Sequence, residues 1–227
     1  LVFSHVADRK VFSEEKSTLR KTTPSGVVFC FWRFFMDLLQ EVALKYGDLL
    51  NKDYLIKASY KKETIEICFF FLPEHFYHLV GFHKLLDMKD LTKPKYLYTS
   101  IISKKITYDT IKNSKFLDDM YDRLQRFCRI NELIDHLKSG EVVIEFSQKN
   151  RTKIQADFLL YDLSNKEYAH LFLRKNGNHG YVPCSFFCRS DEKYICNNKK
   201  YRITEFIVSP RQLTKKSYRS VKNNATI

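Results

Sequence analysis

The sequence predicts an α+β fold in which N-terminal helices and a hairpin pack on a C-terminal antiparallel, curved β-meander. Three observations carry this prediction. Apolar residues follow a helical period in most of the chain before Gly140 and a strand period after it. The connections between the expected C-terminal strands are too short to hold crossover helices, so neighbouring strands run antiparallel. With 227 residues, 44% of them apolar, the chain is long enough to bury a core.

The first predicted element is a helix that follows Met36 and ends near Gly47, where a glycine commonly terminates a helix. Residues 1–26 mix polar residues and proline without a hydrophobic period. We therefore expect residues 1–35 to be a non-native or disordered extension with the natural start at Met36, residues 36–208 to form one domain, and residues 209–227 to be a polar, basic tail.

Residues 54–60 and 64–72, rich in β-branched and aromatic side chains, predict a hairpin. Residues 74–86 predict a helix, since apolar residues and His83 recur at helical spacing after Pro73. Residues 89–106, broken by Pro94, predict a loop with a short strand or helix at 96–103.

The region from Thr107 to Gly140 is helical in period and predicts two helices or one long bent helix. The six strands predicted after Gly140 are residues 141–147, 154–162, 168–174, 181–188, 193–196 and 201–208. Turns are expected at 149–150, 164–165, 176–178 and 197–198.

The net charge is +13, from 39 basic and 26 acidic residues, so a polyanion meets an attractive field before any specific contact. Nucleic acid is the leading partner. An anionic membrane competes, but the basic residues are spread along the chain instead of lining one amphipathic helix. A basic surface without function is the third interpretation.

The six cysteines, Cys30, Cys68, Cys128, Cys184, Cys188 and Cys196, contain no Cys-x-x-Cys pair. Reduced thiols in a cytosolic protein explain them more simply than a zinc cluster or a disulfide scaffold. The apolar run at 27–39 is too short to span a membrane and is interrupted by charged residues, so neither a membrane helix nor a signal peptide is predicted.

The segment 73–85 holds three of the seven histidines, His75, His78 and His83, followed by Lys84. Histidine acts as an acid or base near neutral pH, and lysine supplies a fixed cation. A His-x-x-His spacing is not diagnostic of a metal site, so no metal or other cofactor is expected. The competing interpretation is that these histidines cap and pack a helix, with Gly81 allowing a close backbone approach.

Three segments carry a resemblance: 76–85 (Phe-Tyr-His-Leu-Val-Gly-Phe-His-Lys-Leu), 171–175 (Leu-Phe-Leu-Arg-Lys) and 182–187 (Val-Pro-Cys-Ser-Phe-Phe). Together they resemble the fourth group of phage Barnase-EndoU-colicin-RelE-like (BECR) nuclease domains. The resemblance implies a nuclease-like domain over residues 36–208, with helices preceding an antiparallel sheet. It also implies metal-independent RNA cleavage in the conflict between phages or mobile elements and their hosts.

Matched to the family's motifs, His78 becomes the general base or acid and Lys84 neutralises phosphate charge. Ser185 donates to a phosphate oxygen, although a sheet serine without a catalytic role is an open alternative. Arg174, with Lys175 beside it, is a phosphate contact, and Arg189 is expected to bind substrate from its position alone. His83 and His75 are candidates for the second member of an acid–base pair, and His83 is equally expected to be a packing residue.

The resulting hypothesis is a cytoplasmic, metal-independent endoribonuclease that leaves a 2′,3′-cyclic phosphate and acts as a toxin or effector of a phage or mobile element. Its expected partners are RNA (tRNA, mRNA or ribosome-associated RNA) and an antitoxin or immunity protein, with no membrane. Two alternatives stay open: a noncatalytic RNA-binding module, and a protein-interaction domain of an immunity or regulatory kind.

Overall fold

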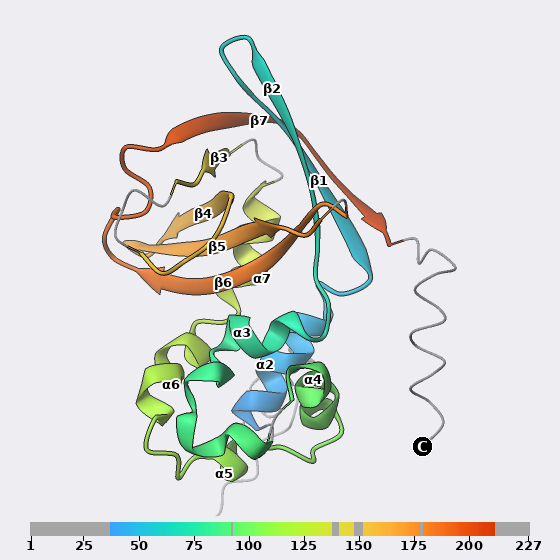
Figure 1. Cartoon of the computed structure of the whole chain (residues 1–227), viewed down its shortest axis with the longest axis vertical. Coiled ribbons are helices and arrows are strands. Elements are labelled where there is room, and N and C mark those ends of the chain that lie inside the picture. The colour runs from blue at the N-terminus through green and yellow to red at the C-terminus, as the bar shows by residue number, and fades with distance from the viewer. Residues whose placement is uncertain (1–36, 92, 138–140, 148–151, 178, 212–227) are drawn as a thin grey trace, which may run out of the picture. The chain divides into compact units, whose positions relative to one another are not determined.

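The computed structural model describes residues 37–91, 93–137, 141–147, 152–177 and 179–211. Figure 1 shows the arrangement of the elements. The helices are α2 (Leu38–Gly47), α3 (His75–Val80), α4 (Pro94–Ile102), α5 (Tyr108–Ile111), α6 (Leu117–Gln125) and α7 (Arg129–His136), with 3₁₀ helices η1 (Phe82–Lys84) and η2 (Leu86–Leu91). The strands are β1 (Lys52–Tyr60), β2 (Glu63–Phe70), β3 (Val142–Glu145), β4 (Phe158–Ser164), β5 (Glu167–Lys175), β6 (Tyr181–Arg189) and β7 (Lys199–Pro210). The predicted α+β class is confirmed.

The sheet is a closed barrel with the strand order β1-β2-β6-β5-β4-β3-β7. Strands β3 to β6 form the predicted antiparallel meander. The hairpin of β1 and β2 was expected to pack on this sheet. Instead, both of its strands are part of the barrel. Its first strand pairs with β7 from Lys52–Pro210 to Ser59–Arg202. The second meets β6 in a parallel contact at Phe69 and Tyr181. Pairing partners this far apart in the chain are invisible to a local pattern.

The β2–β6 junction depends on Gly180, whose φ of 91° lies in the left-handed region. A Cβ on this residue would clash with the carbonyl oxygen of Cys68 on β2. Glycine is therefore required here both by its backbone conformation and by the close approach of the neighbouring strand. The residue directly before the paired Tyr181 thus lets the barrel close.

The predicted strand at 193–196 is wrong, because these residues form a turn before β7. Tyr194 and Ile195 are adjacent and both buried, at 8% and 3% exposure, whereas a strand would place them on opposite faces. The backbone amides of Ile195 and Cys196 both donate to the carbonyl of Glu192. The strand expected at 154–162 begins only at Phe158, and β7 continues beyond the expected end to Pro210.

The helical region also differs from the prediction in two places. Of the short strand or helix expected at 96–103, the structure has the helix, α4, which starts two residues earlier at Pro94, where the missing N–H costs no hydrogen bond. Three helices, α5, α6 and α7, replace the expected one or two between Thr107 and Gly140. Gly140 itself lies outside the described residues.

Two apolar clusters fill the molecule. The larger joins the helices to the barrel interior, and Phe127 contacts Phe186 of β6 across this boundary with ring centroids 5.6 Å apart. The smaller surrounds Phe172 and includes Phe146, Tyr194 and, partly buried, Phe187. Successive side chains of β5 and β6 point to opposite faces of the sheet, so Leu171 and Phe186 join the larger cluster and Phe172 and Phe187 join the smaller one. Residues on the Phe172 and Phe187 face are therefore those that can form a site outside the barrel.

The cysteines of the described residues, Cys68, Cys128, Cys184, Cys188 and Cys196, are free thiols. Cys30 lies outside this part of the chain, as do the expected extension at 1–35, the turn at 149–150 and residues 212–227 of the expected tail. Within the described ranges, no helix has the length and apolar character that a membrane crossing requires.

Candidate functional site

The histidine-rich segment does not form the single helix predicted over residues 74–86. Helix α3 ends at Val80, Gly81 takes a left-handed conformation with φ 94°, and the chain continues as the 3₁₀ helix η1. Glycine is the usual residue for a left-handed helix C-terminus because it has no Cβ to clash. The apolar period continues across this break, since Phe82 and Leu85 are buried like Leu79, which is why the pattern indicated one helix.

The break at Gly81 brings His78 and His83 together. On a continuous helix, residues five apart point about 140° away from each other. Here their ring centroids are 5.3 Å apart with planes inclined by 39°, and Tyr77 lies edge-on to His78 at 5.1 Å. Both histidines are solvent-exposed. The two side chains therefore form a pair that a ligand can reach.

Arg174 approaches this pair from the sheet. Its positive charge contributes to lowering the pKa of His78 and of His75. Arg174 is the last residue but one of β5 and is exposed. No carboxylate in the described ranges lies within ion-pair distance of it.

Ser185 lies on the same sheet face as Arg174. It pairs with Phe172 across β5 and β6, and Arg174 follows Phe172 by two residues, which places both on one side of the sheet. Phe187, two residues further along β6, shares this face. Ser185 is half-buried, and within the described ranges its hydroxyl makes no hydrogen bond. It is thus a hydroxyl with unused donor capacity on the sheet face that also carries Arg174.

Arg123 of α6 is a site residue that the sequence did not indicate. Its Nη1 donates to the carbonyl oxygen of His78 at 3.2 Å, and its guanidinium lies 6.0 Å from the ring centroid of Phe187. The side chain thus connects α3 to the outer face of β6. Burial lowers its pKa to about 10, which still leaves it charged at neutral pH. From the local sequence, Arg123 would be expected only to face Asp119, four residues earlier on the helix surface. The local sequence therefore does not reveal its contacts with His78 and Phe187.

The site lowers the pKa of each of its histidines. Burial, followed by the charges of Arg123, His78 and Lys84, lowers the pKa of His83 to about 4. Burial and then Arg211 lower the pKa of His75 to about 4. For His78, burial lowers the pKa first and Arg174 second. All three imidazoles are therefore neutral at pH 7, the form that accepts a proton.

Lys84 and His75 each make one contact with the backbone. The ammonium of Lys84 donates to the carbonyl oxygen of Asp119, and burial lowers its pKa. His75 accepts a hydrogen bond from the amide of Leu72 at its Nδ1, over 3.2 Å. This bond ties His75 to the chain just before α3, whose N-terminus has no side-chain cap.

The two remaining predicted residues lie on the same strands but further from α3. Lys175 follows Arg174 at the end of β5 and is exposed, and its backbone amide donates to Asp157. Arg189 ends β6 at the other end of the strand from Tyr181, where its Nε lies 2.9 Å from Asp191. The structure therefore brings together His78, His83, Lys84 and Arg174 and leaves Arg189 in an ion pair.

Three cations of this site have no acidic partner among the described residues. Lys84, Arg123 and Arg174 have no carboxylate within 4 Å in the described part of the chain. Some other cations are held by carboxylates: Lys57–Glu205, Lys112–Asp109, Arg126–Glu167, Arg129–Glu132, Arg189–Asp191 and Arg211–Asp53. Unpaired cations around neutral imidazoles form a surface suited to an anion such as phosphate. Across the residues that the structure describes, no group of three or more His, Cys, Asp or Glu side chains is arranged to hold a metal ion.

Comparison with known families gives a match over residues 38–221 to PBECR4, described as phage-Barnase-EndoU-ColicinE5/D-RelE like nuclease4. The chain belongs to this family. The match covers α3, α6, β5 and β6 and so includes the whole candidate site. Comparisons with curated proteins and with solved structures found no match. Family membership supports a nuclease function, with nucleic acid as the substrate.

Proposed function

We propose that this protein is an endoribonuclease that uses the ribose 2′-OH as nucleophile and leaves a 2′,3′-cyclic phosphate. The observation that carries the proposal is the group of neutral histidines and unpaired cations around α3 and η1. Such a group attracts a polyanion and stabilises the extra negative charge that a phosphate gains during cleavage. RNA supplies the 2′-OH proton that a histidine can remove, whereas DNA lacks this hydroxyl.

In this reaction His78 accepts the proton of the 2′-OH. The 2′ oxygen then bonds to phosphorus while the bond between phosphorus and the 5′ oxygen breaks. The His78–His83 pair, with ring centroids 5.3 Å apart, returns one proton to the departing 5′ oxygen. Lowered pKa values favour this scheme because the base must start in its neutral form.

Cations and one hydroxyl stabilise the charged phosphorane. Lys84, Arg123 and Arg174 contribute positive charge, and Ser185 donates to a phosphate oxygen. Lys175 contacts the RNA backbone beside Arg174, whereas Arg189 is held by Asp191 and contributes little. Each role is filled by a side chain, so the scheme uses no metal ion or other cofactor.

The biological role we propose is that of a cytoplasmic toxin or effector of a phage or mobile element. Its target is cellular RNA, either tRNA, mRNA or RNA on the ribosome, and an antitoxin or immunity protein restrains it. Expression of the chain in a bacterial host is expected to arrest growth and fragment RNA, and the His78→Ala variant to do neither.

The direct test is an assay of the purified chain with total RNA, tRNA and ribosomes in EDTA. We expect fragments that end in a 2′,3′-cyclic phosphate, and DNA of equal length left intact. His78→Ala should slow cutting by roughly 10²- to 10⁴-fold, the usual contribution of a general base. His136→Gln is the matched control, because His136 is an exposed histidine held by Asp162 at 2.6 Å on a different helix; its cutting rate should not change.

Two outcomes would replace the proposal. Binding of RNA without cutting, equally strong in His78→Ala, would make the protein a noncatalytic RNA-binding module. Neither binding nor cutting, together with capture of a specific protein, would make it an interaction domain. Circular dichroism of each variant separates loss of chemistry from loss of fold.

A further inference from the structure

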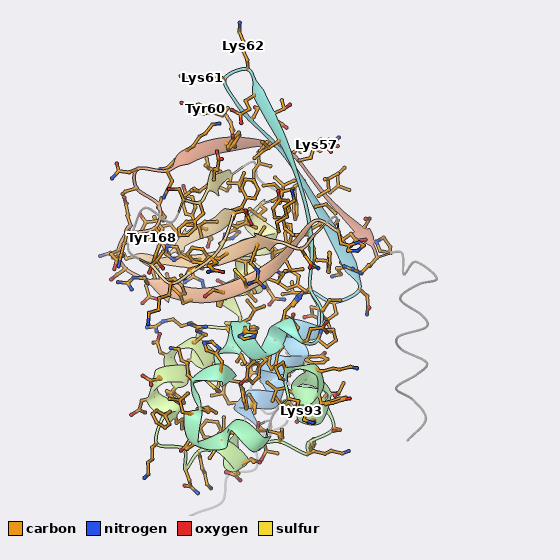
Figure 2. The ribbon with its side chains drawn as sticks, viewed as in Figure 1. Lys57, Tyr60, Lys61, Lys62, Lys93 and Tyr168 are labelled. Carbon is orange, nitrogen blue, oxygen red and sulfur yellow. The ribbon has the colours of Figure 1, made fainter. Side chains whose placement is uncertain are left out.

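The tip of the β1–β2 hairpin is a second basic surface, separate from the His78 site. We define the hairpin tip as residues 60–63. Figure 2 shows Tyr60, Lys61 and Lys62 there, with Lys57 further along the hairpin. Antiparallel pairing of β1 with β7 reaches only Ser59, so at the tip β1 pairs with β2 alone, through Tyr60 and Glu63. The hairpin therefore presents these side chains beyond the rest of the sheet.

Tyr60 carries an exposed ring between two ammonium groups. The residue is 38% exposed, and the Nζ atoms of Lys61 and Lys199 lie 5.3 Å and 5.5 Å from its ring centroid. Lys199 is held by ion pairing to Glu63 and Glu145, and Tyr201 packs edge-on to Tyr60 at 6.1 Å. These neighbours hold the ring in place, and more than a third of the residue stays exposed.

Lys61 and Lys62 have no carboxylate within ion-pair distance among the described residues. Lys61 occupies a left-handed backbone position, with φ 54°, at the turn. Beside them, Lys200 and Arg202 of β7 are exposed, and Arg202 pairs with Ser59. An exposed aromatic ring surrounded by lysines is the combination that binds single-stranded nucleic acid, by stacking on a base and contacting its phosphates.

We propose that the hairpin tip binds a single-stranded part of the RNA substrate at a distance from the cleavage site. The proposal rests on the proposed function, because it names the form of RNA that the nuclease takes. From Glu63 to Phe70, β2 spans about 23 Å at 3.3 Å per residue. The far end of this strand adjoins the site, since the ring of Phe70 lies 6.5 Å from that of His75. A substrate must therefore extend about 20 Å or more to contact both.

The proposal is tested by charge reversal at the tip with a matched control. The test variant is Lys61→Glu with Lys62→Glu. The control is Lys104→Glu with Lys105→Glu, an exposed lysine pair after α4 in which Lys104 also has a left-handed φ, of 59°. Both double variants change the net charge equally. A second pair, Tyr60→Leu and Tyr96→Leu, compares two exposed tyrosines that each have a lysine nearby.

Two probes separate binding from cleavage. A 2′-O-methyl RNA of about 25 nucleotides binds without being cut, and its affinity is measured by fluorescence anisotropy at fixed salt. A dinucleoside monophosphate is too short to reach the tip and reports chemistry alone. We expect the tip variants to bind the long RNA at least about tenfold more weakly than their controls and to cut the dinucleotide at the wild-type rate.

The outcomes distinguish this inference from the proposed function. Equal affinity of tip and control variants for the long RNA would overturn the inference even if the protein cuts RNA. A tip-specific loss of binding to phosphatidylserine vesicles, with RNA affinity unchanged, would overturn it in favour of a membrane contact. A loss of RNA affinity in the tip variants alone would support the inference even if the wild-type protein does not cut RNA. In that case only the proposed function would be wrong.

Discussion

Two clusters in this molecule each combine histidine and arginine side chains. They differ in whether carboxylates contact these side chains. At α3, His78 and His83 lie near Arg123 and Arg174 without a carboxylate in contact among the described residues. Between α7 and β4, Arg129 lies 2.8 Å from Glu132 and 3.4 Å from Asp162, and His136 lies 2.6 Å from the same Asp162. We call the second group the α7–β4 cluster.

The two clusters shift the pKa of histidine in opposite directions. Asp162 raises the pKa of His136 by hydrogen bonding and charge, whereas burial and neighbouring cations lower the pKa values of His78 and His83. Cations that have acidic partners stabilise the fold, and those without partners are available to a ligand. The predictions that follow test this division, from the largest effect to the smallest.

The largest effect is expected from Arg129→Met in the α7–β4 cluster. Arg129 is 9% exposed, and its removal leaves the nearly buried Asp162 without one of its two cationic neighbours. Breaking a buried ion pair costs about 3 kcal/mol of unfolding free energy, measured by urea denaturation. The folded fraction should cut RNA at the wild-type rate.

Arg126→Met is the matched control for this change. Its side chain is 37% exposed and pairs with Asp122 and Glu167, so the loss should stay below about 1 kcal/mol. If Arg126→Met destabilised the fold as much as Arg129→Met, burial would not be what makes the α7–β4 cluster structural.

Arg174→Ala is expected to weaken RNA binding by roughly 10- to 100-fold, since it removes a charged phosphate contact. It should also reduce the slope of log affinity against log salt by about 1. Arg189→Ala provides the comparison on the same sheet face, where Asp191 already holds the guanidinium. We expect a change below about threefold there, and similar losses for both arginines would show that ion pairing does not decide which cations bind RNA.

Gly81→Ala is expected to cost about 1–2 kcal/mol, because a left-handed residue with a Cβ is strained. The new Cβ would make only ordinary contacts, at 3.4 Å from Arg123 and Met120, but strain at the break that places His78 beside His83 should change their geometry and lower the cutting rate about tenfold. Gly177→Ala is the control, since Gly177 has φ 53° but an added Cβ would meet no atom within 4 Å. It should be strained similarly without any effect on cutting, and equal effects on cutting would contradict a role for the break at Gly81.

The smallest effect is the pH dependence of the three histidines, followed by NMR titration of their ring C–H signals. We expect His83 to titrate near pH 4, His78 below 6.5 and His136 above 6.5.

A lowered pKa means that the unfolded chain binds protons first, so the stability contributed by His83 is present above about pH 6.5 and is lost as pH falls toward about 4. For His136 the sign reverses, and its contribution is present below about pH 6.5 and lost as pH rises through its raised pKa. Titration of all three at one pH would remove the distinction between the clusters.

Local patterns predict much of this structure. The hairpin at 54–60 and 64–72 matches β1 and β2 closely, because alternation and turn residues act over neighbouring positions. The segment 73–85 and Arg174 are also identifiable from sequence. By contrast, the pairing of Lys52 with Pro210 and the contact of Arg123 with His78 are set by tertiary packing. The left-handed conformation of Gly81 gives no local signal because buried side chains continue on both sides of it.

The pairing of β1 with β7 also sets a temporal order for synthesis. Lys52 leaves the ribosome well before its pairing partner Pro210 is made. Contacts between such distant positions form late in folding, after most of the chain is available. The α3 half of the site likewise exists before β5 and β6, which supply Arg174 and Ser185. We therefore expect a nascent chain to stay inactive until β7, up to Pro210, has left the ribosome.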